Sequence, residues 1–149
     1  MDTPSWLNKN LIETSLRKYF KDATTRIVTF SCKPAITAGE NYTTYVFRIS
    51  ITYFRGTSSM EQKMSLIVKS MRDGIMEGLV KEMNMFTKEV DMFLSILPKM
   101  TETYGNNVLS ANCINASLEP NPYLILQDLC ELGYKVSERQ KGLDLEHAL

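Results

Sequence analysis

The stretch YTTYVFRISITYF (42–54) decides the fold of this chain of 149 residues. From Val46 to Tyr53, large apolar side chains alternate with Val, Arg, Ser and Thr, which is the period-two pattern of a half-buried strand. The stretch is also rich in Thr, Ile, Tyr and Phe, which fit a pleated surface. The turn RGTSS (55–59) and the short apolar run MSLIVKS (64–70) follow. The sequence therefore predicts two antiparallel strands joined by a hairpin.

Three further segments have the composition of strands: ATTRIVTFSCK (23–33), NVLSANCINAS (107–117) and PYLILQDL (122–129). Their order along the chain, with loops or turns between the first three strands, suggests an antiparallel meander. The sheet is expected to have about five strands and to be mostly antiparallel.

Two segments have helical periodicity. Residues 3–20 predict a helix in which Thr3 is the cap and Pro4 lies in the first turn. Residues 75–97 carry an apolar stripe about 100° wide and predict one long packing helix, which Pro98 ends. The predicted fold is therefore α+β, with an N-terminal helix, the sheet and one long helix in a single domain over residues 1–149.

Composition excludes several classes of protein. The 17 basic and 17 acidic residues balance, which argues against a general nucleic-acid binder. No stretch approaches the roughly 20 apolar residues of a membrane helix, and no signal peptide is recognised, so we expect a cytoplasmic protein. The cysteines lack CxxC spacing and predict neither a zinc site nor disulfides. They are expected to be small core residues in a reducing compartment: Cys32, Cys113 and Cys130.

Four features together suggest phosphate chemistry. They are the loop AGENYTT (38–44), Lys69 at the end of a strand, a carboxylate on the following helix, and QDL (127–129) after the last apolar strand. Loop amides can hold phosphate oxygens, a lysine neutralises them, and a carboxylate keeps that lysine aimed. Glu82 and Glu89 lie on the same helix edge, so spacing leaves both as candidates. Taken singly, each feature is also compatible with an ordinary turn or a solvated charge.

The combination of these motifs resembles the ecdysteroid kinase-like, or CHK kinase-like, family. This is an insect-expanded group of small-molecule kinases similar to choline and aminoglycoside kinases. The resemblance extends over nearly the whole chain from Trp6 onward and implies a protein-kinase-like amino-terminal lobe. Five segments carry it: PAITAGENYTTYVFRISI (34–51), SLIVK (65–69), FTKEVDMFLSILPKM (86–100), YLILQDLCELGY (123–134) and GLDLEHA (142–148).

The resemblance implies an ATP site. Lys69 would contact the phosphates and Glu89, rather than Glu82, would be its helical partner. The family usually has an acidic residue where this chain has Gln127, and we expect little loss because hinge contacts to adenine are mostly made by the backbone. The implied loop over the phosphates consists of Gly39, Glu40, Asn41, Tyr42 and Thr43. The implied hinge beside adenine consists of Gln127, Asp128 and Leu129.

Kinases of this fold carry their catalytic aspartate and magnesium ligands in a second lobe after the hinge. We therefore expect no catalytic residue and no metal ligand in this chain, with Mg²⁺ bound only where that lobe is present. Asp144 would belong to a linker and His147 to a helix surface. The expected partners are a nucleotide and, in the parent family, a small hydroxyl-bearing substrate, with no nucleic acid and no membrane.

Two other interpretations remain open at this point. One is a catalytically inert binding or interaction module, or a truncated copy of such a kinase. The other is an unrelated α+β ligand-binding domain in which Lys69 and Glu89 are plain surface charges. A separation of more than about 10 Å between those two side chains, beyond direct pairing, would favour the latter.

Overall fold

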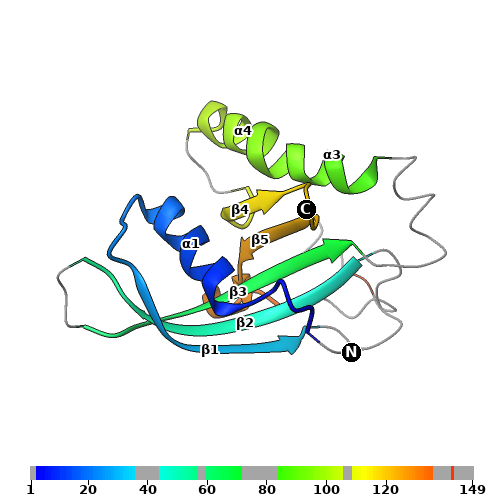
Figure 1. Cartoon of the computed structure of the whole chain (residues 1–149). Helices are drawn as coiled ribbons and strands as arrows, with labels where there is room; N and C mark the ends of the chain where they lie inside the picture. The colour runs from blue at the N-terminus through cyan, green and yellow to red at the C-terminus, as the bar shows by residue number, and fades with distance from the viewer. Residues whose placement is uncertain are drawn as a thin grey trace.

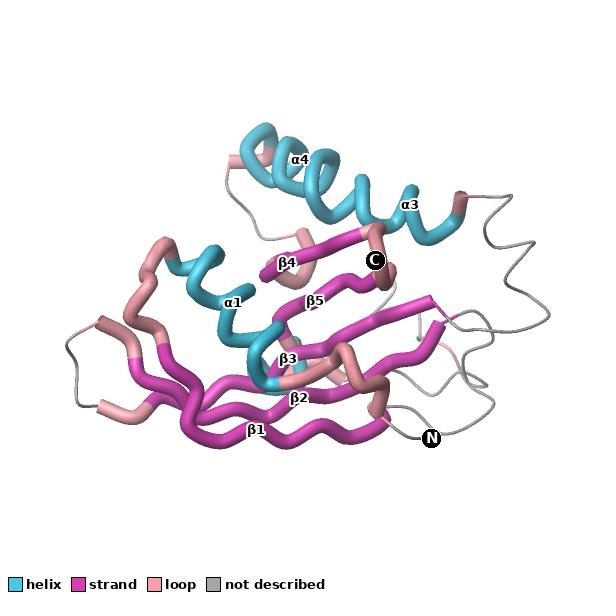
Figure 2. Tube along the Cα trace, viewed as in Figure 1, coloured by secondary structure: helices cyan, strands magenta, loops and turns pink. Residues whose placement is uncertain are grey.

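A five-stranded antiparallel sheet with a helix packed against each face forms the protein (Figure 1). The computed structural model describes residues 3–35, 44–56, 60–71, 84–105, 109–135 and 142. No helix within these ranges is long and apolar enough to cross a membrane. The predicted α+β architecture is confirmed, with the following elements (Figure 2): α1 (Lys9–Phe20), β1 (Arg26–Pro34), β2 (Thr44–Phe54), β3 (Gln62–Met71), α3 (Met85–Asp91), the π-helical turn η1 (Met92–Ile96), α4 (Leu97–Thr103), β4 (Cys113–Ser117), β5 (Tyr123–Gln127) and the 3₁₀-helix η2 (Leu129–Leu132).

The strands lie in the order β1-β2-β3-β5-β4, and every neighbouring pair is antiparallel. The first three strands form the predicted meander. After the α3–α4 helices the chain forms the edge strand β4 and then turns back, so that β5 lies between β4 and β3. This return places Leu124 of β5 opposite Lys69 of β3, with Val46 of β2 on the other side of Lys69.

The alternation predicted for β2 is confirmed by the burial of its side chains. Phe47 and Ile49 are fully buried and Ile51 is nearly so, all on the face that α1 covers. From α1, Ile12 and Leu16 complete this core and are also fully buried. Burial of such aliphatic side chains supplies most of the stability that a single domain of this size needs.

The prediction that the first helix begins at Thr3 is wrong, because Asn8 caps it. The Asn8 Oδ1 accepts a hydrogen bond from the Leu11 N–H at 3.1 Å, and Asn is among the best N-cap residues. Before the cap, the Leu7 N–H donates to the Pro4 carbonyl oxygen at 3.0 Å. Pro4 therefore belongs to a turn that precedes the helix.

The second helix continues beyond Pro98, where it was predicted to end. A π-helical turn precedes the proline, and the Leu97 N–H donates to the Met92 carbonyl oxygen. Pro98 then lies in the first turn of α4, where its missing N–H costs little. The wider turn also shifts the helical phase, so Leu94 is 52% exposed instead of lying on the predicted stripe. The predicted first part, 75–83, lies outside the described residues.

A second, smaller core lies between α3 and the other face of the sheet. Phe86 and Val90 of α3 pack against Leu124 and Leu126 of β5. Ile125, between those two leucines, belongs to the α1 core. Because alternate residues of β5 enter different cores, the two helices must cover opposite faces of the sheet.

The three cysteines are free thiols, but only two of them contribute to the interior. Cys32 and Cys113 are half-buried. Cys130 is exposed, so the expectation that all three are core residues is wrong for this one. Cys130 lies in η2, which has no buried residue.

Candidate functional site

An ion pair between Lys69 of β3 and Glu89 of α3 joins the sheet to the helix above it. The Lys69 Nζ donates a hydrogen bond to the Glu89 Oε1. Lys69 lies opposite Leu124, and side chains that are cross-strand neighbours point to the same face. Leu124 is fully buried beneath α3, so Lys69 extends from the face that this helix covers.

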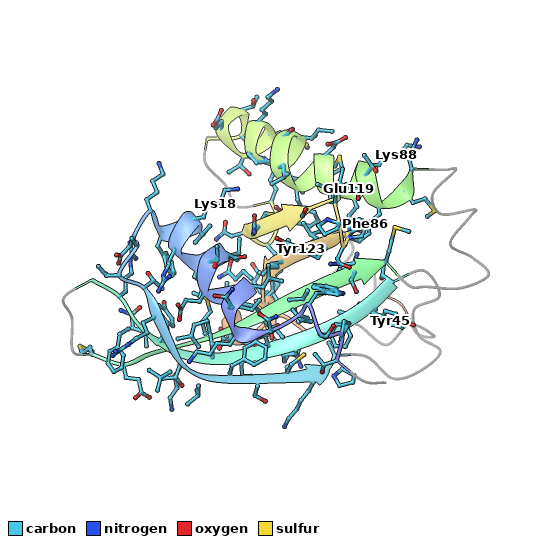
Figure 3. All side chains as sticks on the ribbon, in the orientation of Figure 1. Lys18, Tyr45, Phe86, Lys88, Glu119 and Tyr123 are labelled. Carbon is cyan, nitrogen blue, oxygen red and sulfur yellow. The ribbon has the colours of Figure 1, made fainter. Side chains whose placement is uncertain are left out.

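The packing of α3 explains why Glu89 reaches Lys69. Phe86 and Val90 are each 4% exposed and hold the helix on the sheet. Glu89 lies at the edge of this buried stripe, whereas Lys88 is exposed and points away from the sheet (Figure 3). The sequence alone left Glu82 as an alternative partner, and Glu82 lies outside the described residues.

The pair is accessible enough to meet a ligand. The side chains of Lys69 and Glu89 are 24% and 29% exposed. A pair that water can reach contributes only about 0–1 kcal/mol to stability, so the fold does not depend on it. An ammonium group carries three N–H donors, and Glu89 accepts from one of them. The others can bind the oxygens of an anionic group while Glu89 keeps the side chain in place.

An apolar surface lies beside the ammonium group. Val46 is opposite Lys69, and Ile67 is opposite Leu126, so all four side chains belong to the same face of the sheet. Val46 and Ile67 are half-buried, and Leu126 is 8% exposed. This surface can receive a flat, uncharged group attached to an anion.

Of the residues predicted to form the hinge, Asp128 makes the most contacts, and its side chain points into the protein. It is 2% exposed. One carboxylate oxygen, Oδ2, accepts from the Arg48 Nε at 2.7 Å and from the Ser65 Oγ at 2.8 Å. The other oxygen accepts from the Cys130 N–H at 3.1 Å and so caps η2. Asp128 therefore ties the segment after β5 to both β2 and β3.

These contacts determine the charge state of Asp128. Burial by itself would raise the pKa of the carboxyl group. Hydrogen bonds from Ser65, Cys130 and Arg48, together with the positive charge of Arg48, outweigh the burial and hold the pKa below its ordinary value. Asp128 is therefore an ionised carboxylate at neutral pH that accepts three hydrogen bonds.

The neighbours of Asp128 leave mainly backbone groups for a ligand. The Gln127 side-chain Oε1 accepts from the Asn112 Nδ2 at 3.1 Å, and the Gln127 N–H donates to the Asn112 carbonyl oxygen at 2.9 Å. Leu129 is the first residue of η2, where an N–H has no acceptor inside its own helix. A ligand at this edge would meet the backbone around Leu129 rather than the side chains of Gln127 and Asp128.

The loop predicted to cover phosphates, Gly39–Thr43, lies outside the described residues. The strands on either side of it are described. The Ala35 N–H donates to the Val46 carbonyl oxygen at 2.8 Å, and Val46 is the neighbour of Lys69 in the sheet. The described ends of β1 and β2 are therefore hydrogen-bonded to each other at Val46.

Sequence reasoning missed three residues of this region. In the predicted alternation of β2, Arg48 belongs to the side opposite the large apolar residues, and the sequence assigns it no role. Ser65 and Glu131 gave no signal, yet the Ser65 N–H donates to the Glu131 Oε2 at 2.9 Å. The register of β2 against β3 places Arg48 opposite Ile67 on the Lys69 face, and no local pattern in the sequence indicates this pairing.

A comparison with protein families identifies the chain. The model described as the ecdysteroid kinase-like family matches residues 38–149. The chain belongs to the ecdysteroid kinase-like family. Within this ecdysteroid kinase-like chain, the match includes Lys69, Glu89 and the segment 127–129, and it begins after α1 and β1. No curated protein and no solved structure matches the chain.

Proposed function

We propose that this chain is the ATP-binding lobe of a small-molecule kinase. Membership of the ecdysteroid kinase-like family supports a kinase-like protein. The observation that carries the nucleotide assignment is the ion pair of Lys69 and Glu89 on the α3 face of the antiparallel sheet. In protein kinases a strand lysine paired with a helix glutamate must be in place for phosphoryl transfer. The direct pairing also argues against the interpretation of these residues as unrelated surface charges.

Each group in the site has a distinct role in this proposal. Lys69 binds phosphate oxygens, and Glu89 holds the ammonium group toward them. Backbone amides of the loop 39–43 cover the phosphates. The adenine base lies on the apolar surface beside Val46, and its edge hydrogen-bonds to the backbone of 127–129. The full site thus uses positioning and charge neutralisation, which account for most of the catalysis in phosphoryl transfer.

Magnesium and the acceptor belong to the wider reaction. When bound, Mg²⁺ would neutralise the negative charge that develops on the phosphate groups during transfer. No three His, Cys, Asp or Glu side chains gather into a metal site in the described ranges. We propose a small hydroxyl-bearing compound as acceptor. A cytoplasmic location fits the free thiols, since such compartments keep cysteines reduced.

The proposal is tested by titrating ATP into the parent chain and the Lys69→Met variant. A hydrogen bond to a charged group contributes about 1.5–3 kcal/mol, so the substitution should weaken ATP binding about tenfold to a hundredfold. Lys63→Met is the matched control, because Lys63 is an exposed lysine of the same strand and should leave the affinity unchanged.

Two outcomes would contradict the proposal. Equal ATP affinity in the parent chain and Lys69→Met would remove Lys69 from the phosphate site. A folded parent chain that does not bind ATP would instead favour the inert binding or interaction module. Circular dichroism of each protein shows whether it is folded.

A further inference from the structure

Arg48 and Asp128 form a charged pair of unequal exposure on the Lys69 face of the sheet. The Arg48 Nε lies 2.7 Å from the Asp128 Oδ2, and the two side chains are 41% and 3% exposed. The remaining bonds to the carboxylate come from Ser65 and the Cys130 N–H. The carboxylate thus accepts three hydrogen bonds inside the protein, and the guanidinium is the part of the pair that reaches the surface.

The sheet register places Arg48 between Lys69 and the hinge segment. Val46 is opposite Lys69, and Arg48, two residues further along β2, is opposite Ile67. Two residues of a strand span about 7 Å. The step from Val46 to Arg48 leads toward the hinge segment 127–129. Ile67, which is opposite Arg48, also lies opposite Leu126, near the end of β5 where the hinge segment begins. A nucleotide with its phosphates at Lys69 and its base toward the hinge would therefore place the base near Arg48.

Stability alone is a weak reason for a buried carboxylate at this position. An apolar pair of similar volume is often as stable as a buried ion pair. What the pair provides is orientation. Asp128 binds the guanidinium through Nε, and the Arg48 Nη2 also lies 3.4 Å from the Cys130 Sγ. Two anchoring points fix the plane of a group that stacks well on aromatic rings.

We propose that Arg48 is a base-contacting residue of the nucleotide site, positioned by Asp128. The exposed part of its guanidinium stacks on the purine base, while Lys69 binds the phosphates. This inference rests on the proposed function and adds a residue that favours a large aromatic base. The proposed site then has a part that binds phosphate, at Lys69, and a part that binds the base, at Arg48. The affinity of each part can be measured separately with a probe that carries only phosphates or only the nucleoside.

The test uses ATP, adenosine and inorganic tripolyphosphate as three probes, titrated calorimetrically in the absence of Mg²⁺. Arg48→Lys keeps the charge but removes the planar group, and should raise the dissociation constants of ATP and adenosine about fivefold to thirtyfold. It should leave that of tripolyphosphate unchanged. Lys69→Met should show the opposite split, weakening tripolyphosphate and leaving adenosine unchanged. Arg26→Lys, an exposed arginine of β1, is the control and should change none of the three.

A second variant protects the test against loss of folding. The double variant Arg48→Gln/Asp128→Asn removes both charges together and leaves no unpaired charge in the interior. It should reproduce the selective loss of adenosine and ATP. Unchanged adenosine affinity in both Arg48 variants would overturn the role of Arg48 while leaving Lys69 in place. An equal loss of affinity for all three probes in these variants would also overturn the role of Arg48 as a residue that contacts the base. A parent chain that binds no ATP would overturn the proposed function itself.

Discussion

Replacing Asp128 with alanine should lower the free energy of unfolding by about 2–3 kcal/mol. The substitution removes the acceptor of three donors: the Ser65 hydroxyl, the Cys130 N–H and the Arg48 guanidinium. Each buried donor left without an acceptor costs about 1–3 kcal/mol. Ser65 is 8% exposed and must bear most of that cost.

The exposure of Arg48 limits the effect. Breaking a fully buried ion pair costs about 3–5 kcal/mol, because the remaining charge stays buried. The Arg48 side chain is 41% exposed and can turn toward water when Asp128 is gone. Its contribution is therefore small, and the expected total lies below that of a fully buried pair.

Urea unfolding provides the assay, followed by the fluorescence of Trp6, the only tryptophan of the sequence. Its ring stacks on Tyr123 with centroids 5.8 Å apart, so the signal reports on the core. Asp91→Ala, at an exposed position of α3, is the control and should change stability by less than about 0.5 kcal/mol. An Asp128→Ala chain as stable as Asp91→Ala would refute the assigned network.

The same contacts predict a dependence on pH. Hydrogen bonds to Ser65, Cys130 and Arg48 lower the pKa of folded Asp128 below the ordinary value of 3.8. Because the folded pKa is the lower one, this stabilisation is complete well above pH 3.8 and is lost as the pH falls through 3.8 and then through the folded pKa. Asp128→Asn should reduce the loss of stability in that acid range. An identical acid profile in the two proteins would show that the carboxylate does not contribute.

Two further predictions concern the second core and the thiols. Leu124→Ala should lower the free energy of unfolding by about 2–5 kcal/mol, because Leu124 is fully buried under α3. The control Leu109→Ala, at a position that is 44% exposed, should change the free energy of unfolding little. Equal effects of the two substitutions in urea unfolding would argue against this packing. Near pH 8, iodoacetamide should alkylate the exposed Cys130 before the other two thiols, since burial raises the pKa of both Cys32 and Cys113. Peptide mass spectrometry measures the order in which the thiols react. Faster reaction of Cys113 than of Cys130 would contradict this prediction.

Local patterns predicted the strands well and the ends of helices poorly. The alternation in β2 is visible in the sequence because burial on one face of a strand repeats every second residue. The start of α1 depends on which of several capping residues is used, and Asn8 competes with Thr3. The course of the second helix depends on a π-helical turn before Pro98, which leaves no periodic signal.

The candidate site depends on contacts between distant segments, which spacing cannot supply. The sequence offered Glu82 and Glu89 as partners of Lys69, and only the seating of Phe86 against the sheet explains why Glu89 reaches it. The inward direction of Asp128 follows from contact with Arg48 on another strand. Such information resides in the register of the sheet rather than in any local motif.

A structure of the chain with a non-hydrolysable ATP analogue tests the proposed nucleotide site most directly. We expect phosphate oxygens within about 3 Å of the Lys69 Nζ, which is hydrogen-bonding distance. The base should lie over Val46 and Ile67, against Arg48 and toward the backbone of 127–129. An analogue bound at any other surface, with no phosphate near Lys69, would contradict the proposed function.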